Sequence, residues 1–173
     1  MKRVIWVSVI VLAVTIAILS FASDSAPDLP AGSVADLVVI DKSARSLTLF
    51  RESQSLKTYQ VSLGGSPVGH KRQEGDGRTP EGVYTIDFHK RDSAFHRGLH
   101  ISYPSAADIR SAKARRVSPG GDIMIHGLPN GFGVVGSLHR RSDWTAGCIA
   151  VTNNEIEELW RAVPDGTPVK ITP

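Results

Sequence analysis

Cysteine is almost absent from this chain. Its 173 residues contain a single cysteine, Cys148, which lies far from the N-terminus. One cysteine cannot close an intrachain disulfide, and its position excludes lipidation of an N-terminal cysteine. The roles left open for Cys148 are a packed spacer, half of an intermolecular disulfide, a metal ligand and a nucleophile.

Common zinc-binding motifs are absent as well. The sequence has no HExxH and no CxxC. A zinc hydrolase would have to use His126, His139 and Cys148, at spacings that match none of the usual clusters. The glycine-rich loop at residues 74–82 lacks the Lys-Ser/Thr of a phosphate-binding loop, which argues against nucleotide binding. We therefore expect neither a metal nor a cofactor.

A strong charge of one sign is also missing. The formal net charge is +3, from 20 Lys and Arg against 17 Asp and Glu. Lys2 and Arg3 lie in the N-terminal segment, so 18 basic residues face 17 acidic ones in the rest of the chain. Such a small net positive charge is too weak to attract nucleic acid or an acidic surface, and we expect no nucleic-acid partner.

Charged residues are absent from the apolar run at residues 4–22, which follows Lys2 and Arg3. As a helix this run would be roughly 28 Å long, close to the hydrocarbon thickness of a bilayer. The stretch Ser20 to Ala22 resembles a signal-peptidase site, so residues 1–22 are either a cleaved signal peptide or a membrane anchor. Both interpretations place the rest of the chain in the periplasm or on the outer face of the cytoplasmic membrane.

Periodicity is missing from residues 23–33, which we interpret as a linker. Residues 34–173 show no internal repeat and read as a single domain, mainly β with short helices, preceded by an N-terminal hydrophobic helix. Strands are expected within 35–51 (two strands around a polar turn), 55–63, 83–89, 98–104, 122–127 and 166–172, and helices at 105–116 and 152–163.

A cysteine nucleophile needs a base, donors for an oxyanion and access to substrate. Gly147 permits a tight turn before Cys148, and the dipole of the helix expected from Thr152 would favour a thiolate nearby. Of the six histidines, His126 is the best placed, because it ends an apolar strand and Gly127 follows it. A packed, unreactive cysteine is the alternative at this stage.

Two segments resemble the signature of a known family. "IHG" at 125–127, a glycine-containing loop and "TAGCIAV" at 145–151 are similar to the YkuD-type L,D-transpeptidase catalytic domain. Its signature is His-Gly, a variable loop and Ser/Thr-His-Gly-Cys-Ile/Val-Arg. "RTPEGVY" at 78–84 and "DGTPVKI" at 165–171 resemble further segments of the family in the same order, so the resemblance covers residues 34–173.

Two positions depart from that signature. Ala146 stands where the family usually has His, and Ala150 where it usually has Arg. "DWTAGCIAV", with "HISYP" upstream, is similar to the YafK-like branch, in which these departures are normal. Arg140 or Arg141 is our candidate for supplying the charge that Ala150 lacks.

The resemblance implies a YkuD-like β-sandwich or barrel-like fold and acyl transfer on peptidoglycan stem peptides. Cys148 would be the nucleophile and His126 the general base. The backbone N–H groups of Gly147 and Cys148 would hold the oxyanion, with Gly127 and Thr145 supporting that region and its turns. Tyr103 and Trp144 are weaker candidates for substrate binding.

The implied activity serves cross-linking or remodelling of the cell wall. An amine acceptor would resolve the thioester into a cross-link, and water would hydrolyse it. The alternatives are an L,D-type amidase that releases D-Ala or a wall-attached lipoprotein, and a non-catalytic wall-binding module. Membrane contact is expected only through the N-terminal segment.

Overall fold

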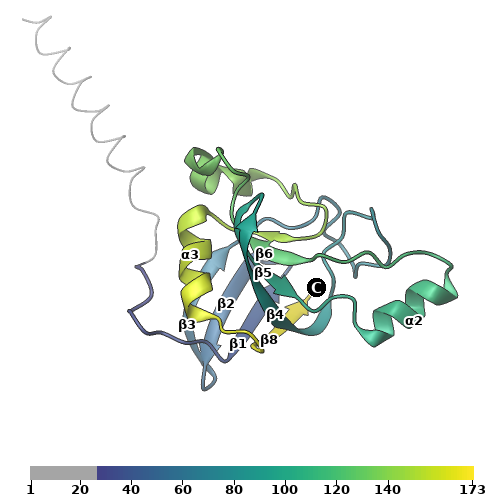
Figure 1. The fold of residues 1–173 in the computed structure, drawn as a ribbon, viewed down its shortest axis with the longest axis horizontal. Coiled ribbons are helices and arrows are strands. Elements are labelled where there is room, and N and C mark those ends of the chain that lie inside the picture. Colours follow the sequence, from purple (N-terminus) through teal and green to yellow (C-terminus); the bar gives the residue numbers. More distant parts are fainter. Residues whose placement is uncertain (1–26) are drawn as a thin grey trace, which may run out of the picture.

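The computed structural model describes residues 27–173 (Figure 1). The expected signal peptide or anchor at residues 1–22 lies outside this range, as does the start of the expected linker. Among the described residues, no helix is both long and apolar enough to cross a bilayer.

An eight-stranded mixed sheet forms the body of the protein, in the order β3-β2-β1-β8-β4-β5-β6-β7. The pairs β1–β8 and β6–β7 are parallel, and the other neighbours are antiparallel. The expectation of a mainly β fold with short helices is confirmed. The strands are β1 (Leu37–Asp41), β2 (Ser46–Arg51), β3 (Gln54–Gln60), β4 (Gly82–Ser93), β5 (His96–Ile101), β6 (Met124–His126), β7 (Ile149–Ala150) and β8 (Pro168–Thr172).

Strand β4 connects the two halves of the sheet, because residues 82–85 pair with β8 and residues 86–93 pair with β5. The two ends of the sheet then meet through the segment that follows β3. Ser62 exchanges two backbone hydrogen bonds with Ala150 of β7, at 2.8 and 3.0 Å, and Thr145 donates to the Leu63 carbonyl at 3.1 Å. This contact gives the sheet a barrel-like closure next to Cys148.

Two α-helices lie within the predicted ranges 105–116 and 152–163, and both begin with a capping box. In α2 (Ala106–Ala114) and α3 (Asn153–Ala162), Ser105 and Thr152 are the N-caps, and each completes a capping box with the acidic residue three positions on. Two 3₁₀ turns joined at Gly136 form η1 (Gly133–Arg141). The sequence pattern predicts no helix at η1, because this glycine-rich stretch lacks helical periodicity.

The buried carboxylate of Glu158 holds α3 to its surroundings. It accepts from the Lys57 ammonium at 2.7 Å and the Tyr59 hydroxyl at 2.9 Å, and also from the Leu29 N–H at 3.2 Å. The end of the expected linker is therefore fastened to α3 rather than free.

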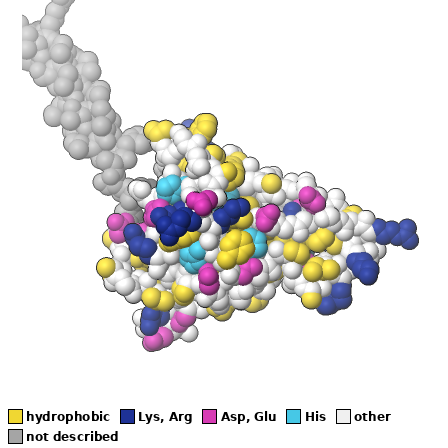
Figure 2. Space-filling model, in the orientation of Figure 1, with side chains coloured by type: hydrophobic (Ala, Val, Ile, Leu, Met, Phe, Trp, Pro, Cys, Tyr) yellow, Lys and Arg dark blue, Asp and Glu magenta, His cyan; other side chains and the backbone are white. Residues whose placement is uncertain are grey.

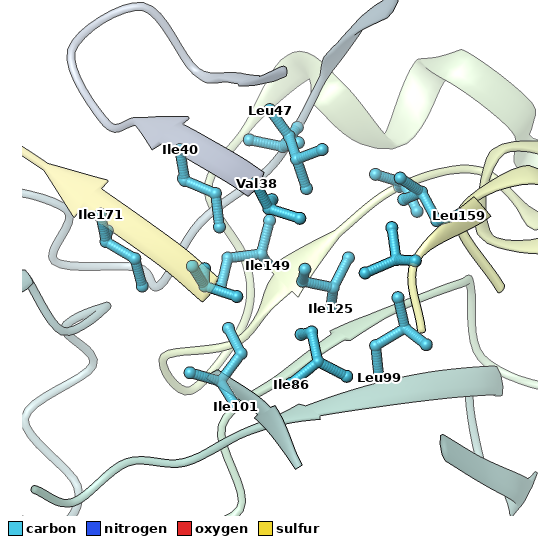
Figure 3. Packing of buried hydrophobic residues seen from close by; sticks show 14 of the residues in the cluster. Val38, Ile40, Leu47, Ile86, Leu99, Ile101, Ile125, Ile149, Leu159 and Ile171 are labelled. Carbon is cyan, nitrogen blue, oxygen red and sulfur yellow. The ribbon is translucent and has the colours of Figure 1, made fainter. Parts of the chain in front are cut away.

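Alternating residues of both sheet halves fill one core (Figure 3). Ile125 and Ile149 of neighbouring strands are fully buried there, together with Leu99 and Ile101 of β5. Burial of each such side chain contributes about 1.5–3 kcal/mol. Side chains alternate along a strand, so the residues directly before and after each of these four point to the opposite face of the sheet. We call that face the outer face.

Candidate active site

Residues 145–148 form a tight turn that presents the cysteine. The Thr145 hydroxyl donates to the Cys148 carbonyl at 2.7 Å and accepts from the Gly147 N–H at 3.1 Å. Gly147 has a φ of +137°, and a Cβ at this position would lie 2.6 Å from the Arg78 carbonyl oxygen. The position requires glycine on both counts. In this structure its N–H donates to the Thr145 hydroxyl, whereas the family resemblance predicts a contact of this N–H with the oxyanion.

Cys148 and His126 come from neighbouring parallel segments and share the outer face. The register pairs Ile125 with Ile149 and His126 with Ala150. Cys148 directly precedes Ile149, a core residue, and therefore points to the outer face, as His126 does after Ile125. Neighbouring strands lie about 4.8 Å apart. Because His126 stands opposite Ala150, the candidate base lies diagonally across the strand pair from Cys148, two positions along.

His126 has one ring nitrogen fixed by the backbone. Nδ1 lies 2.7 Å from the Gly127 carbonyl oxygen and donates to it, which leaves the lone pair on Nε2. The side chain is 4% exposed and packs against Phe95, with ring centroids 4.5 Å apart. Burial lowers the pKa of His126, so the imidazole is neutral at neutral pH and can accept a proton.

Cys148 is half-buried, with its thiol between two backbone groups. Sγ donates to the Asp122 carbonyl at 3.5 Å, and the backbone of Met124 also hydrogen-bonds to it. Burial raises the pKa of Cys148 above that of an ordinary thiol. The expected helix-dipole activation stays a prediction, with α3 beginning at Asn153, five positions after Cys148.

Gly127 allows α3 to approach the candidate base closely. A Cβ on Gly127 would lie 2.8 Å from the Asn153 side-chain oxygen and 3.1 Å from Ile156. The same Asn153 oxygen accepts from the Leu128 N–H at 2.9 Å. The start of α3 therefore fixes the chain immediately after His126.

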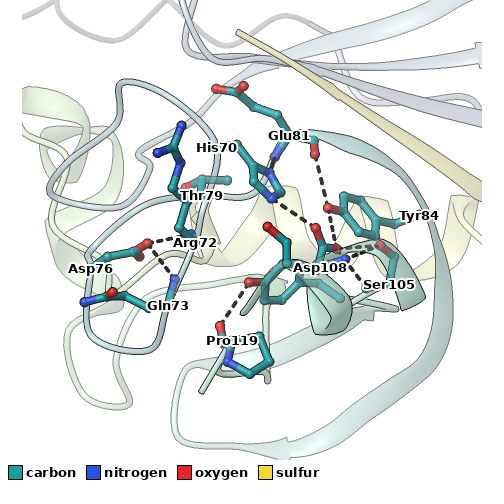
Figure 4. Close-up of polar contacts among 12 residues, drawn as sticks. His70, Arg72, Gln73, Asp76, Thr79, Glu81, Tyr84, Ser105, Asp108 and Pro119 are labelled. Carbon is teal, nitrogen blue, oxygen red and sulfur yellow. Dashed lines mark hydrogen bonds and ion pairs between the residues drawn. The ribbon is translucent and has the colours of Figure 1, made fainter. Parts of the chain in front are cut away.

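The loop between β3 and β4 packs against the nucleophile turn and contains a buried ion pair. Lys71 is 3% exposed, and its ammonium lies 2.9 Å from the Asp76 carboxylate. Burial opposes ionisation of Asp76, but backbone N–H groups of the loop, among them that of Arg72, together with Lys71 lower its pKa to about 2. Figure 4 shows the Asp76 carboxylate accepting from the backbone N–H groups of Arg72 and Gln73 in the same loop. The Lys71 charge acts on Cys148 and favours its thiolate.

Replacing Lys71 should therefore make the thiol less reactive. In Lys71→Met the pKa of Cys148 should rise further, and alkylation by iodoacetamide at neutral pH should slow by about threefold or more. Lys71→Arg should retain most of the rate, and Lys170→Met, which removes an exposed lysine on β8, should leave it unchanged. An alkylation profile against pH that is identical in wild type and Lys71→Met would contradict this electrostatic role.

The structure places the weaker candidates in different surroundings. Arg140 binds both carboxylate oxygens of Glu155, at 2.5 and 2.6 Å, whereas Arg141 is exposed. Tyr103 is 3% exposed and donates to the Pro119 carbonyl at 2.9 Å. It therefore has almost no surface to offer a substrate. The Glu155 pairing also ties Arg140 to the cap of α3.

Trp144 stands between two histidines. Its ring lies edge-on to His126, with centroids 5.9 Å apart, and its Nε1 donates to Nδ1 of His139 at 3.4 Å. Burial lowers the pKa of His139 to about 4, and Nδ1 also lies 3.1 Å from the Ser62 hydroxyl. Among residues 27–173, no three His, Cys, Asp or Glu side chains are grouped as metal ligands.

Lys71 and Asp76 were not among the residues predicted from the sequence. Their loop is polar and glycine-rich, which is typical of a solvated loop, and no periodicity marks either residue as buried. The only local signal is Asp76 itself, because an aspartate between two glycines favours a turn held by its own side chain.

Comparison with known proteins agrees with this geometry. The model of the YkuD family, described as the L,D-transpeptidase catalytic domain, matches residues 35–171. YafK of Escherichia coli (strain K12) is 28% identical over 132 residues, which cover 73% of this chain and 46% of that protein.

Solved structures show the same fold. The helical cell shape determining protein Pgp2 of Campylobacter jejuni has a TM-score of 0.59 at 24% identity, covering 88% of this chain and 53% of that one. Bd1075 of Bdellovibrio bacteriovorus has a TM-score of 0.57 at 22% identity, covering 84% and 50%. The chain spans about half the length of these relatives. With nearly all of its described residues matched by the family model, the chain belongs to the YkuD family of L,D-transpeptidase catalytic domains.

Proposed function

We propose that this protein is a cysteine-dependent L,D-transpeptidase that acts on the stem peptides of peptidoglycan. The observation that carries the proposal is the parallel pair β6–β7, whose register puts His126 opposite Ala150, two positions from Cys148. The family match supplies the reaction class. The substrate follows from the bond that this class of enzyme breaks, which is the amide between an L-centre residue and D-Ala.

The reaction begins from an uncharged pair. Burial raises the pKa of the Cys148 thiol and lowers that of the His126 imidazole, so the resting state is thiol and neutral imidazole rather than an ion pair. Proton transfer therefore accompanies attack. Nε2 of His126 takes the thiol proton as Sγ bonds to the carbonyl carbon of the L-centre residue.

The first half-reaction ends in a thioester. As the tetrahedral intermediate collapses, the C–N bond to D-Ala breaks and His126 gives its proton to the leaving amine. Because Thr145 engages the Gly147 N–H, we assign the oxyanion contact to the Cys148 N–H. The Lys71 charge next to the site stabilises the negative charge that develops there.

We also propose that the reaction takes place outside the cytoplasmic membrane. The sequence of residues 1–22, with two cations before an apolar run, supports export. Peptidoglycan is found on that side. The N-terminal segment would then keep the domain next to the wall as an anchor, or be removed as a signal peptide.

Mass spectrometry of muropeptides tests the proposed function. Incubation of the full chain with purified tetrapeptide muropeptides should yield cross-linked dimers with loss of D-Ala. Monomers that lose D-Ala without dimers would indicate hydrolysis. In a separate incubation with a muropeptide that carries a lipoprotein peptide, release of that peptide would indicate an amidase. Unchanged muropeptides after incubation of a correctly folded protein would contradict catalysis and favour a wall-binding module.

A further inference from the structure

A second histidine lies on the outer face in line with the candidate nucleophile. Leu99 and Ile101 of β5 are buried in the core, so His100 between them points to the outer face. His100 pairs with Met124, and Met124 stands opposite Cys148 in the continued register of β6 and β7. His100, Met124 and Cys148 therefore form a row across neighbouring strands, whose ends are about 10 Å apart.

Asp122 borders both ends of this row. Its backbone carbonyl accepts from Sγ of Cys148 at 3.5 Å, and its carboxylate lies 3.8 Å from Nε2 of His100. A group bound to Cys148 over Met124 would therefore lie between the sulfur and the His100 ring.

A β-bulge in β4 orients the His100 ring. Ile86 pairs with Ile101 and Phe88 pairs with His100, so Asp87 is an extra residue in β4. The bulge brings two side chains onto one imidazole. Asp87 lies 2.6 Å from Nδ1, and the Phe88 ring stacks on His100 with centroids 4.4 Å apart and an interplanar angle of 14°. Nδ1–H donates to the carboxylate, which leaves the Nε2 lone pair for another partner.

Strand β5 has a glycine opposite the candidate base. Gly98 pairs with His126 and precedes Leu99 by one position, so β5 places no side chain opposite the candidate base. A Cβ on Gly98 would lie 3.1 Å from the Met124 sulfur. Figure 2 shows histidine, acidic and hydrophobic side chains gathered over the front strands of the sheet, where β4 and β5 lie in Figure 1.

We propose that His100, oriented by Asp87, is the general base of the second half-reaction. This inference rests on the proposed function, because it requires a thioester on Cys148. The nucleophile that resolves the thioester carries an N–H or O–H, as an acceptor amine or as water. Its nitrogen or oxygen bonds to the acyl carbon, its proton passes to Nε2 of His100, and the C–S bond breaks. The released Cys148 thiolate then regains a proton from His100 through solvent.

The geometry divides the two proton transfers between two histidines. His126 is almost fully buried and lies two positions along the strand pair from Cys148, which suits transfer between the thiol and the leaving amine. The His100 side chain is 11% exposed and its partner Asp87 is 40% exposed, so Asp87 connects this dyad to solvent. The thioester carbonyl would lie between the two bases.

Intact-mass spectrometry of the quenched full chain, after mixing with a tetrapeptide muropeptide, tests the proposal. In His100→Gln the thioester adduct on Cys148 should form at nearly the wild-type rate but decay about 10²-fold more slowly, and so accumulate. Asp87→Asn, which changes a more exposed side chain, should slow decay in the same direction to a smaller extent. Faster decay on addition of glycine would identify the resolving nucleophile as an amine, and no change would identify it as water.

A second histidine–aspartate pair provides the matched control. His89 contacts Asp165 at 2.5 Å and packs on Trp160 beneath α3, so His89→Gln should leave both rates unchanged. If His100→Gln and Asp87→Asn form product without accumulating the adduct, the proposed role of His100 is wrong. The proposed function would be unaffected by that result. Absence of both adduct and product in wild type would overturn the proposed function itself, and this inference with it.

Discussion

Cys148→Ala should abolish turnover of muropeptides, with a loss of about 10⁴-fold or more. The thiol forms the covalent bond to substrate in the proposed mechanism, and the described surroundings of Cys148 offer no other nucleophile of comparable strength on the turn. The fold should survive, because Cys148 is half-buried and its removal costs about 1 kcal/mol. Cross-link formation measured by mass spectrometry, together with thermal unfolding, checks both expectations.

A neighbouring substitution controls for disturbance of the loop. Ser142→Ala changes an exposed residue shortly before the turn and should keep full activity. His126→Gln should lose nearly as much activity as Cys148→Ala, since nucleophile and base act as a unit. Full activity of Cys148→Ala would contradict the proposed cysteine mechanism.

Gly147→Ala should destabilise the protein and inactivate it together. A φ of +137° is strained for alanine, and the new Cβ would lie 2.6 Å from the Arg78 carbonyl oxygen. Strain of this kind costs about 1–2 kcal/mol, and the backbone clash should raise the total to about 3 kcal/mol or more. The melting temperature should fall by roughly 10 °C. Displacement of the turn should reduce activity about 10²-fold.

Gly166→Ala isolates the strain from the clash. Gly166 has a φ of +87°, and a Cβ there would meet no heavy atom within 4 Å. This variant should lose only about 1–2 kcal/mol and keep its activity, since Gly166 lies in the turn before β8. Equal destabilisation of the two variants, measured by denaturant unfolding, would show that the contact with Arg78 is unimportant.

Local patterns were sufficient to predict the helices and most strands. The Ser105 and Thr152 capping boxes mark the starts of α2 and α3 within a residue, because capping depends on neighbours three positions away. These features need no knowledge of distant contacts.

Features of the site that depend on pairing between distant strands were not predictable. The bulge that sets Asp87 against His100 arises from register between β4 and β5, and no spacing in the sequence encodes it. The engagement of the Gly147 N–H follows from the turn geometry around Thr145. Burial of Lys71 depends on how a long loop folds back on the nucleophile turn, which hydrophobic periodicity does not describe.

The closure of the sheet beside Cys148 has a consequence for how the protein acquires activity. The Leu63 N–H donates to Asp143 at 2.9 Å across a separation of 80 residues, and Ser62 bonds to Ala150 over a longer one. Contacts of such long range form late in folding, because the entropy of closing the intervening chain must be overcome first. The thiol should therefore become catalytically competent only when nearly the whole domain has folded, so that partly folded chains remain inert.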